Sequence, residues 1–260
     1  MMAHPELFDT ARGWQPEWFD PALLAALGDG SPAALRSLVT EVTPGVFMLP
    51  FFTAAFCGML MDELRAYEAT PLEKTRPNSM NNYGLILNDM GLEGMMSALL
   101  EGYARPFAAE LFPEAGSAVD HHHSFLVQYA PGQDTHLDMH IDDSEVTLNV
   151  SLTSEFTGAG LAFCGNIHST SHRKHSLTYA HRLGYAVIHL GRHRHGALHI
   201  EAGERVNLIM WMRSAELRRQ PGYTHISRVV GEEDPDAVCL SRTHDPDYDE
   251  WREKFGGVPA

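Results

Sequence analysis

Two His-X-Asp pairs lie in tandem within residues 136–142, which read His-Leu-Asp-Met-His-Ile-Asp. In an extended strand successive side chains point to opposite faces, so His136, Asp138, His140 and Asp142 would share one face. The apolar residues between them would share the other face and pack against a core. The stretch therefore predicts a strand that offers imidazole and carboxylate groups to a metal ion from one side.

A third histidine suited to metal binding, His195, lies far downstream in the run Gly-Arg-His-Arg-His-Gly. Two ligands at i and i+2 of one strand and a third from a distant strand suit a barrel, whose strands converge on a shared interior. Two neutral imidazoles and one carboxylate form the facial triad of non-haem iron(II) sites, which leaves coordination positions open. We therefore predict that His140, Asp142 and His195 bind metal. His136 and Asp138 are the rival pair, farther from the next turn and suited to an access channel.

An arginine follows the third histidine at a spacing that suggests a shared cavity. Arg205 stands ten residues beyond His195, after the turn-like residues 201–204. A hairpin here would pair the two strands and point both side chains into one cavity. The guanidinium fork holds a carboxylate through two hydrogen bonds, as an oxoacid co-substrate would require. A surface arginine at a strand start is the alternative.

Other residues in this region have simpler interpretations. Adjacent residues of a strand alternate faces, so His121, His122 and His123 cannot all bind one ion, and we expect them to pack or to face solvent. We expect His193 and His199 to be ordinary strand residues, although they share the parity of the third ligand. Trp211 and residues 166–182 would face a primary substrate, but a core position is the expected role of Trp211.

Composition limits the class of protein. The 260 residues are 44% hydrophobic, enough for a sizeable core, and carry a net charge of −15. Such acidity disfavours binding to nucleic acid, which requires basic surfaces, and makes a basic substrate conceivable. Thirteen of the 16 histidines fall within residues 120–213, where we expect the chemistry.

The lack of targeting patterns and the number and spacing of the cysteines predict a cytoplasmic protein. No apolar run is long enough to cross a bilayer, and the first residues lack the pattern of a signal peptide. The three cysteines, Cys57, Cys164 and Cys239, are widely spaced and odd in number. We therefore expect reduced thiols rather than a disulfide framework or a zinc site.

The pattern of elements changes near residue 120. Capping signals predict helices at residues 19–28 and from Ser31-Pro32 to about Val42. An amphipathic helix is expected at 53–68 and a long helix at 91–112, kinked or divided by Pro106. Strands are expected near 46–49 and 83–87. Beyond 120, short alternating segments predict a mainly β double-sheet roll with strands at 122–129, 136–142, 145–153, 160–163, 183–190, 197–200 and 205–213. We predict three parts: a mostly helical supporting region over residues 1–119, a β core over 120–213 and an appendage over 214–260.

The motifs of the β region carry a family resemblance. Gln-Tyr129, His140-Ile-Asp142, Asn149, His195-Gly and Arg205 occur in the order and spacing typical of 2-oxoglutarate and iron(II)-dependent oxygenases. Within that superfamily the chain resembles the prolyl/lysyl-hydroxylase branch, and especially its poorly characterised oxygenase-domain-containing proteins. The resemblance covers about residues 120–213. It implies a double-stranded β-helix, or jelly roll, backed by N-terminal helices.

The resemblance also assigns roles to individual residues. It implies that His140, Asp142 and His195 bind Fe(II) and that Arg205 binds the distal carboxylate of 2-oxoglutarate. Tyr129 and Asn149 match positions that line the co-substrate pocket in lysyl hydroxylases; an interior tyrosine and a local hydrogen bond are the alternatives.

The implied reaction is an oxidation of a C–H bond. It would consume O2 and 2-oxoglutarate, with ascorbate as an accessory reductant, and would hydroxylate a peptidyl lysyl or prolyl side chain or an amino-acid-like substrate. Halogenating relatives replace the carboxylate ligand, and since Asp142 is present we expect hydroxylation. Two alternatives remain open: a metal-binding barrel that senses without turnover, and a cupin-type zinc or manganese enzyme.

Overall fold

The structure, a computed structural model, describes residues 2–223 and 231–255. Capping side chains start the first two helices as predicted: Asp20 accepts a hydrogen bond from a backbone N–H of α1, and Ser31 does so for α2. Thr53 caps α3 in the same way, which was not predicted. Helix α1 ends at Asp29, one residue beyond the predicted end at residue 28. Gly30 follows as the C-cap and stops the helix, because it adopts the left-handed conformation, with φ +68°. The longer helices of this half are α1 (Pro21–Asp29), α2 (Pro32–Leu38), α3 (Ala54–Glu68), α4 (Glu93–Leu99) and α5 (Arg105–Leu111).

Two other helix predictions have different outcomes. The helix expected over 91–112 is divided, as predicted for Pro106, into α4, a π-helical turn (Leu100–Ala104) and α5. The extension of α2 to Val42 was wrong. Residues Thr40–Thr43 form strand β1, since three of its four residues are β-branched and favour a strand.

A seven-stranded antiparallel sheet forms the larger wall of the barrel. Its order is β1-β2-β10-β6-β13-β4-β3. Strands β1 to β3 come from the first 119 residues, so that region contributes strands as well as helices. The domain boundaries at 119 and 213 stay a prediction. The strands are β1, β2 (Val46–Pro50), β3 (Gly84–Ile86), β4 (His121–Tyr129), β6 (Val146–Ser151), β10 (Tyr185–Leu190) and β13 (Arg205–Arg213).

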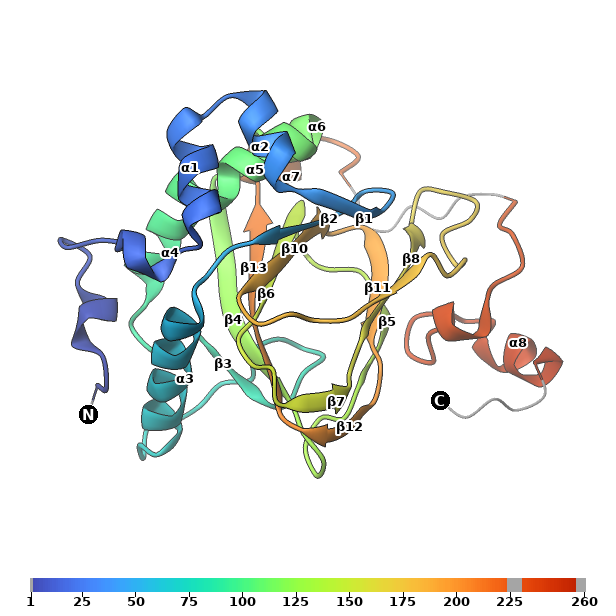
Figure 1. Ribbon diagram of the computed structural model, residues 1–260. Coiled ribbons are helices and arrows are strands. Elements are labelled where there is room, and N and C mark those ends of the chain that lie inside the picture. The colour runs from blue at the N-terminus through green and yellow to red at the C-terminus, as the bar shows by residue number, and fades with distance from the viewer. Residues whose placement is uncertain (1, 224–230, 256–260) are drawn as a thin grey trace.

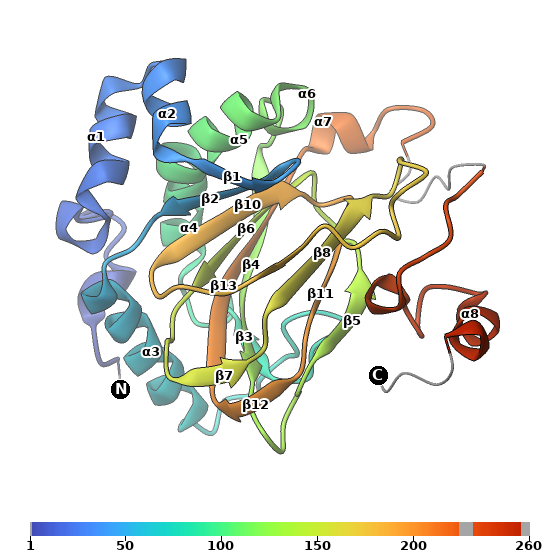
Figure 2. The same ribbon diagram turned by 45° about the vertical axis from the view of Figure 1, so that its right-hand side comes forward.

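A smaller sheet faces this wall across the barrel, and the N-terminal helices lie outside the larger sheet (Figures 1 and 2). Its order is β5-β11-β8-β9, and a two-stranded sheet of β12 and β7 lies at one end. The predicted double-stranded β-helix is confirmed. The strands are β5 (Leu137–His140), β7 (Phe156–Gly158), β8 (Leu161–Asn166), β9 (Leu177–Tyr179), β11 (His193–Ala197) and β12 (Ile200–Gly203).

Strand boundaries after residue 153 differ from the prediction. The strand expected over 197–200 was wrong, since Ala197 ends β11 and Ile200 begins β12. Short strands β7 and β9 were not predicted. Strand β9 lies within residues 166–182, which we expected to face a primary substrate. Each of the two strands has only three residues, too few for a periodic pattern to appear in the sequence.

Alternation along β13 separates the hydrophobic core from the barrel interior. One set of side chains packs with the N-terminal helices in the largest hydrophobic cluster: Val206, Leu208, Met210 and Met212. The other set faces the interior: Arg205, Asn207, Ile209 and Trp211. Because successive side chains of a strand point to opposite faces, one face of β13 packs against the helices and the other lines a pocket.

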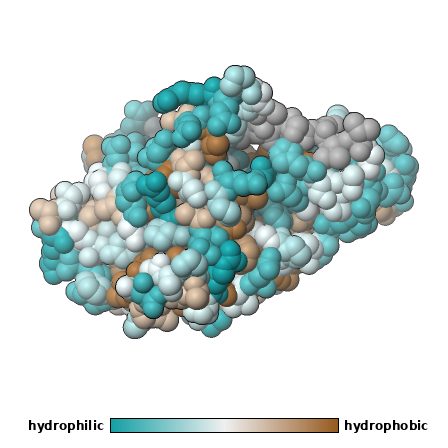
Figure 3. All heavy atoms as spheres, turned by 90° about the horizontal axis from the view of Figure 1, so that it is seen from above, coloured by the Kyte–Doolittle hydropathy of each residue, from teal (hydrophilic) through white to brown (hydrophobic). Residues whose placement is uncertain are grey.

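The surface agrees with the acidic composition. On the face that carries α1, α2 and α7 (Ala215–Arg218), most of the visible surface is hydrophilic and the hydrophobic areas are small and scattered (Figure 3). Within residues 2–223 and 231–255, no helix has the length and apolar character needed to span a membrane.

The cysteines correct one prediction. Cys164 and Cys239 form a disulfide, so reduced thiols were wrong for this pair, while Cys57 is free and buried. The bond joins β8 to the C-terminal segment, whose last helix is α8 (Tyr248–Lys254). The pair is 75 residues apart in sequence, yet its Cα atoms lie 6.1 Å apart. Spacing could not reveal this, because the segment returns to the barrel only in the folded chain.

We expect one reactive thiol in the denatured, unreduced protein and three after reduction, counted with a thiol reagent. Reduction should lower the free energy of unfolding by up to about 4 kcal/mol, because it opens a loop of some 75 residues. The Cys164→Ala/Cys239→Ala double variant is the control, whose stability should not respond to reductant. Three thiols before reduction would contradict the disulfide.

Candidate active site

Three ligand atoms meet at the end of β5. His140 closes β5 and pairs directly with His195 on β11, while Asp142 follows β5 and donates its backbone N–H to the carbonyl of Gly191. The Nε2 atoms of His140 and His195 lie 3.4 and 3.6 Å from the Asp142 carboxylate oxygens. All three side chains are buried, and their ligand atoms lie within 4.8 Å of one another. The predicted metal-ligand set is therefore brought together.

Hydrogen bonds fix the orientation of both imidazoles. The Nδ1 atom of His140 lies 2.8 Å from the carbonyl of Asp138, and that of His195 lies 2.9 Å from the carbonyl of His193. A carbonyl only accepts, so each Nδ1 carries the proton and each Nε2 presents a lone pair. Burial holds the pKa of His195 well below its usual value, which keeps this ring neutral. The donor set suits a divalent transition metal such as iron(II).

The carboxylate is held in its charged form. Burial by itself would raise the pKa of Asp142, but the adjacent His195 and His140 outweigh it and hold that pKa below the usual carboxyl value. Thr147 on β6 donates its hydroxyl to Asp142 Oδ2 at 2.6 Å, and Ser144 lies 2.7 Å from the same hydroxyl. Thr147 therefore orients a ligand oxygen, as outer hydrogen bonds do at metal sites.

Replacing Thr147 by valine should weaken iron(II) binding about 10- to 100-fold, the usual effect of losing such a support. Valine keeps the shape but cannot donate to Asp142. Anaerobic iron titration of the two proteins measures the change. Thr178→Val, on strand β9, is the matched control, and equal iron affinity of Thr147→Val and wild type would contradict the role.

The rival pair does not join the site. Asp138 accepts hydrogen bonds from Ser241 Oγ and the backbone N–H of Thr243, both at 3.0 Å, and so points to the C-terminal segment. The ring of His136 stacks on His199 at 4.1 Å. The predicted common face for all four side chains was wrong, because the pairing of β5 with β11 has an irregularity that breaks the alternation.

Among the described residues, the remaining histidines form no further cluster that could hold a metal ion. His121 pairs with Asp120 on the surface, and His122 lies within hydrogen-bond distance of Ser124. His123 Nε2 lies 3.0 Å from the carbonyl of Pro77. Their predicted packing or solvent-facing role is confirmed. His193 is an ordinary strand residue, as expected: its Nε2 lies 2.9 Å from the carbonyl of Cys164, and only its backbone carbonyl contacts His195.

Arg205 reaches the same pocket from the opposite sheet. The predicted hairpin was wrong: β11 pairs with β5 and β8, whereas β13 pairs with β4 and β6. Residues 200–203 form β12 between them, so the chain crosses the barrel. The expected shared cavity is nevertheless present, lined by both His195 and Arg205.

The guanidinium of Arg205 is buried without an acidic partner. It is 2% exposed, donates from Nη1 to the carbonyl of Ala159 at 2.6 Å and stacks on the Tyr129 ring at 4.4 Å. Its Nε has no hydrogen-bond partner, and no acidic side chain of the described ranges pairs with it. A buried cation lacking a counter-ion is costly. The arrangement is therefore suited to an anionic ligand such as a carboxylate.

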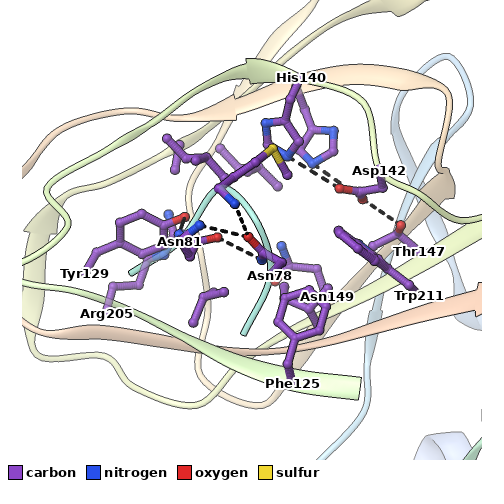
Figure 4. Close-up of a pocket in the computed structure, with 17 residues that line it drawn as sticks. Asn78, Asn81, Phe125, Tyr129, His140, Asp142, Thr147, Asn149, Arg205 and Trp211 are labelled. Carbon is purple, nitrogen blue, oxygen red and sulfur yellow. Dashed lines mark hydrogen bonds and ion pairs between the residues drawn. The ribbon is translucent and has the colours of Figure 1, made fainter. Parts of the chain in front are cut away.

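Tyr129 and Asn149 line this inner pocket, as predicted (Figure 4). The Asn149 Oδ1 accepts from Asn207 Nδ2 at 2.7 Å. Asn207 Oδ1 and His181 Nε2 are buried without partners nearby. Burial, together with Arg205, holds the pKa of His181 well below its usual value. Trp211 also lines the pocket while it packs on Phe125, so it is not only a core residue.

The segment 78–81 was missed by the sequence analysis. Asn78 Oδ1 accepts the backbone N–H groups of Met80 and Asn81, both at 2.8 Å, and Asn81 Nδ2 donates to the Tyr129 hydroxyl at 2.9 Å. Asn78, Met80 and Asn81 all line the inner pocket (Figure 4). The run Pro-Asn-Ser-Met-Asn-Asn predicts a turn, but not where that turn lies.

Comparisons with known proteins agree with this site. Residues 2–117 match the OGFOD2-like domain. The 2-oxoglutarate and iron-dependent oxygenase domain-containing protein CP2 of Arabidopsis thaliana is 39% identical, over 77% of this chain and 53% of that protein. The human domain-containing protein 2 is 37% identical, over 83% of this chain and 63% of its own length. The chain thus spans between half and two thirds of these relatives.

A solved prolyl hydroxylase has the same fold. The enzyme of Trichoplax adhaerens, in complex with a hypoxia inducible factor peptide fragment, superposes with a TM-score of 0.52 at 13% identity, covering 74% of this chain and 94% of that one. At this identity the likeness concerns the fold, while the sequence relatives and the His-Asp-His site carry the assignment. The chain belongs to the 2-oxoglutarate and iron(II)-dependent oxygenase superfamily.

Proposed function

We propose that this chain is a 2-oxoglutarate- and iron(II)-dependent dioxygenase that hydroxylates a C–H bond of a lysyl- or prolyl-type peptidyl side chain, or of an amino-acid-like substrate. One atom of O2 would enter the substrate as a hydroxyl group. The other would enter succinate as 2-oxoglutarate loses carbon dioxide. The observation that carries the proposal is the buried, unpaired Arg205 facing the His-Asp-His triad across one pocket.

The residues have separate tasks in this proposal. His140, Asp142 and His195 would hold iron, which when bound supplies the redox chemistry. Arg205 would bind the distal carboxylate of 2-oxoglutarate, with Tyr129 beneath the guanidinium. The barrel walls would exclude water. Ascorbate is proposed as an accessory reductant, by family resemblance alone.

The peptide substrate is supported by the Trichoplax prolyl hydroxylase, which binds a hypoxia inducible factor peptide fragment. We also propose a cytoplasmic location. The disulfide makes that location worth testing by cell fractionation, because disulfides are rare in reducing compartments.

We expect loading with iron(II) and 2-oxoglutarate to increase hydrogen exchange at the amides of Met80 and Asn81. The inner cavity measures about 40 Å³, room for about three water molecules, so we expect 2-oxoglutarate to enter by displacing segment 78–81, which lines the cavity. That movement would break the bonds from both amides to Asn78. The amide of Leu208 in β13 is the control. Unchanged exchange in the loaded protein would show that the segment stays in place.

The deciding experiment is an anaerobic titration of apo-protein with iron(II) and then 2-oxoglutarate, followed by an assay for succinate in air. The proposal expects a visible metal-to-ligand charge-transfer band and oxygen-dependent succinate. A sensing barrel would bind metal but form no succinate. A zinc or manganese enzyme of cupin type would turn over without oxygen. Bound iron without the band would overturn the proposal.

A further inference from the structure

A second, larger cavity opens on the outer side of the metal ligands. It measures about 430 Å³, within the range of about 300–1,000 Å³ found for ligand sites, and we call it the outer pocket. Met80, His140, Asp142 and Trp211 line both the inner and the outer pocket. The triad therefore lies at the junction of two spaces, one containing Arg205 and the other open to a larger molecule.

The C-terminal segment builds the far wall of the outer pocket. Arg173 pairs with Glu232 and with Asp247, each at 2.9 Å, and Arg194 pairs with Asp245 at 2.5 Å. Arg194 directly precedes the ligand His195 and is 3% exposed. The Arg194 pair holds the C-terminal segment against β11, the strand that carries His195. The Arg173 pairs hold it against the segment between β8 and β9, and the disulfide at Cys239 adds a covalent link to β8.

The charges around the outer pocket are already neutralised. Both arginines of its wall have carboxylate partners, and Asp143 at its edge pairs with Arg213 and Arg218 at 2.8 Å. Within the described ranges, every arginine and carboxylate of the lining except the metal-site residue Asp142 already has an oppositely charged partner, while Arg173 Nε makes no hydrogen bond. Burying an ammonium or a carboxylate here would be costly, because no unpaired charge of the wall would compensate its loss of hydration.

The outer pocket has an apolar part, and both ring nitrogens of His172 are also buried in its lining without hydrogen-bond partners among the described residues. Ile141, Ile167 and Met80 line the apolar part, together with the indole of Trp211. The Nε1 atom of Trp211 is buried, no described residue accepts a hydrogen bond from it, and Trp211 as a whole is 7% exposed. Indole nitrogen can only donate, and buried donors are normally satisfied. An acceptor from a ligand, such as a peptide carbonyl, would satisfy it.

We infer that the outer pocket binds an uncharged aliphatic side chain of a peptide substrate, with a carbonyl of that peptide accepting from Trp211 Nε1. The inference rests on the proposed function and narrows it, since it favours a prolyl- or leucyl-type side chain over a lysyl one. The apolar wall would hold the target C–H bond beside the metal ligands, and the paired charges would exclude an ionic side chain.

The test uses full-length protein loaded with iron(II) and 2-oxoglutarate and four capped pentapeptides, Gly-Gly-Xaa-Gly-Gly, with Xaa as Pro, Leu, Lys or Glu. We expect the Pro and Leu peptides to stimulate succinate formation at least about tenfold over the Lys and Glu peptides. Trp211→Phe should raise the KM for the stimulating peptide about two- to tenfold, the loss of one neutral hydrogen bond. Trp14→Phe, in the helical region, is the matched control.

The charge-transfer band separates the possible failures. With the band present, equal or greater stimulation by the Lys or Glu peptide, or none by any of the four, would overturn the substrate class. An unchanged KM in Trp211→Phe would overturn the role of the indole. Loss of the band in wild-type protein would instead sink the proposed function itself, and the inference with it.

Discussion

Replacing His140 by alanine is expected to abolish iron(II) binding, whereas replacing His136 by alanine should leave it unchanged. Both residues begin a His-X-Asp pair, but only His140 directs Nε2 toward Asp142 and His195, while His136 stacks on His199. Removing a direct ligand should cost more than the about 10- to 100-fold lost with an outer support. Iron affinity by anaerobic titration, with the charge-transfer band as a second readout, measures the effect.

The two alanine variants control for each other. They remove the same type of side chain from two positions four residues apart in one segment. A general loss of folding should therefore lower the melting temperature of both variants. Iron binding that survives in His140→Ala but fails in His136→Ala would show that the tandem motif had been assigned in the wrong register.

Replacing Arg205 by methionine should raise the dissociation constant for 2-oxoglutarate by about 10- to 100-fold or more without lowering the melting temperature. Hydrogen bonds to charged groups contribute about 1.5–3 kcal/mol each, and about 1.4 kcal/mol corresponds to tenfold in affinity. Stability should hold because the charge is buried without an acidic partner, so its removal relieves a desolvation cost. Titration of the band and thermal unfolding measure the two quantities.

Arg205→Lys tests whether charge alone suffices. Lysine keeps the charge but loses the planar fork, so we expect affinity for 2-oxoglutarate between those of wild type and Arg205→Met. A large fall in melting temperature in Arg205→Met would mean that this arginine stabilises the barrel through Tyr129 and Ala159, contrary to a role in binding an anion.

The sequence predicted the parts of the fold that depend on neighbouring residues. The caps at Asp20 and Ser31, and the division of the long helix at Pro106, follow from local backbone geometry. Strands β4, β6, β10 and β13 followed from two-residue alternation. Three-residue strands β7 and β9 gave no such pattern, and β1 was misread as the end of a helix.

The sequence by itself determined the candidate ligand set, because His140 and Asp142 lie two residues apart near a strand end and the motif continues to His195 and Arg205. Tertiary structure alone decided the rest. The β5 irregularity turned Asp138 away, the chain carried Arg205 to the opposite sheet, and the C-terminal segment brought Cys239 to Cys164. Local patterns report on which face a side chain shares with its neighbours. They carry no information about which distant segments the folded chain brings into contact.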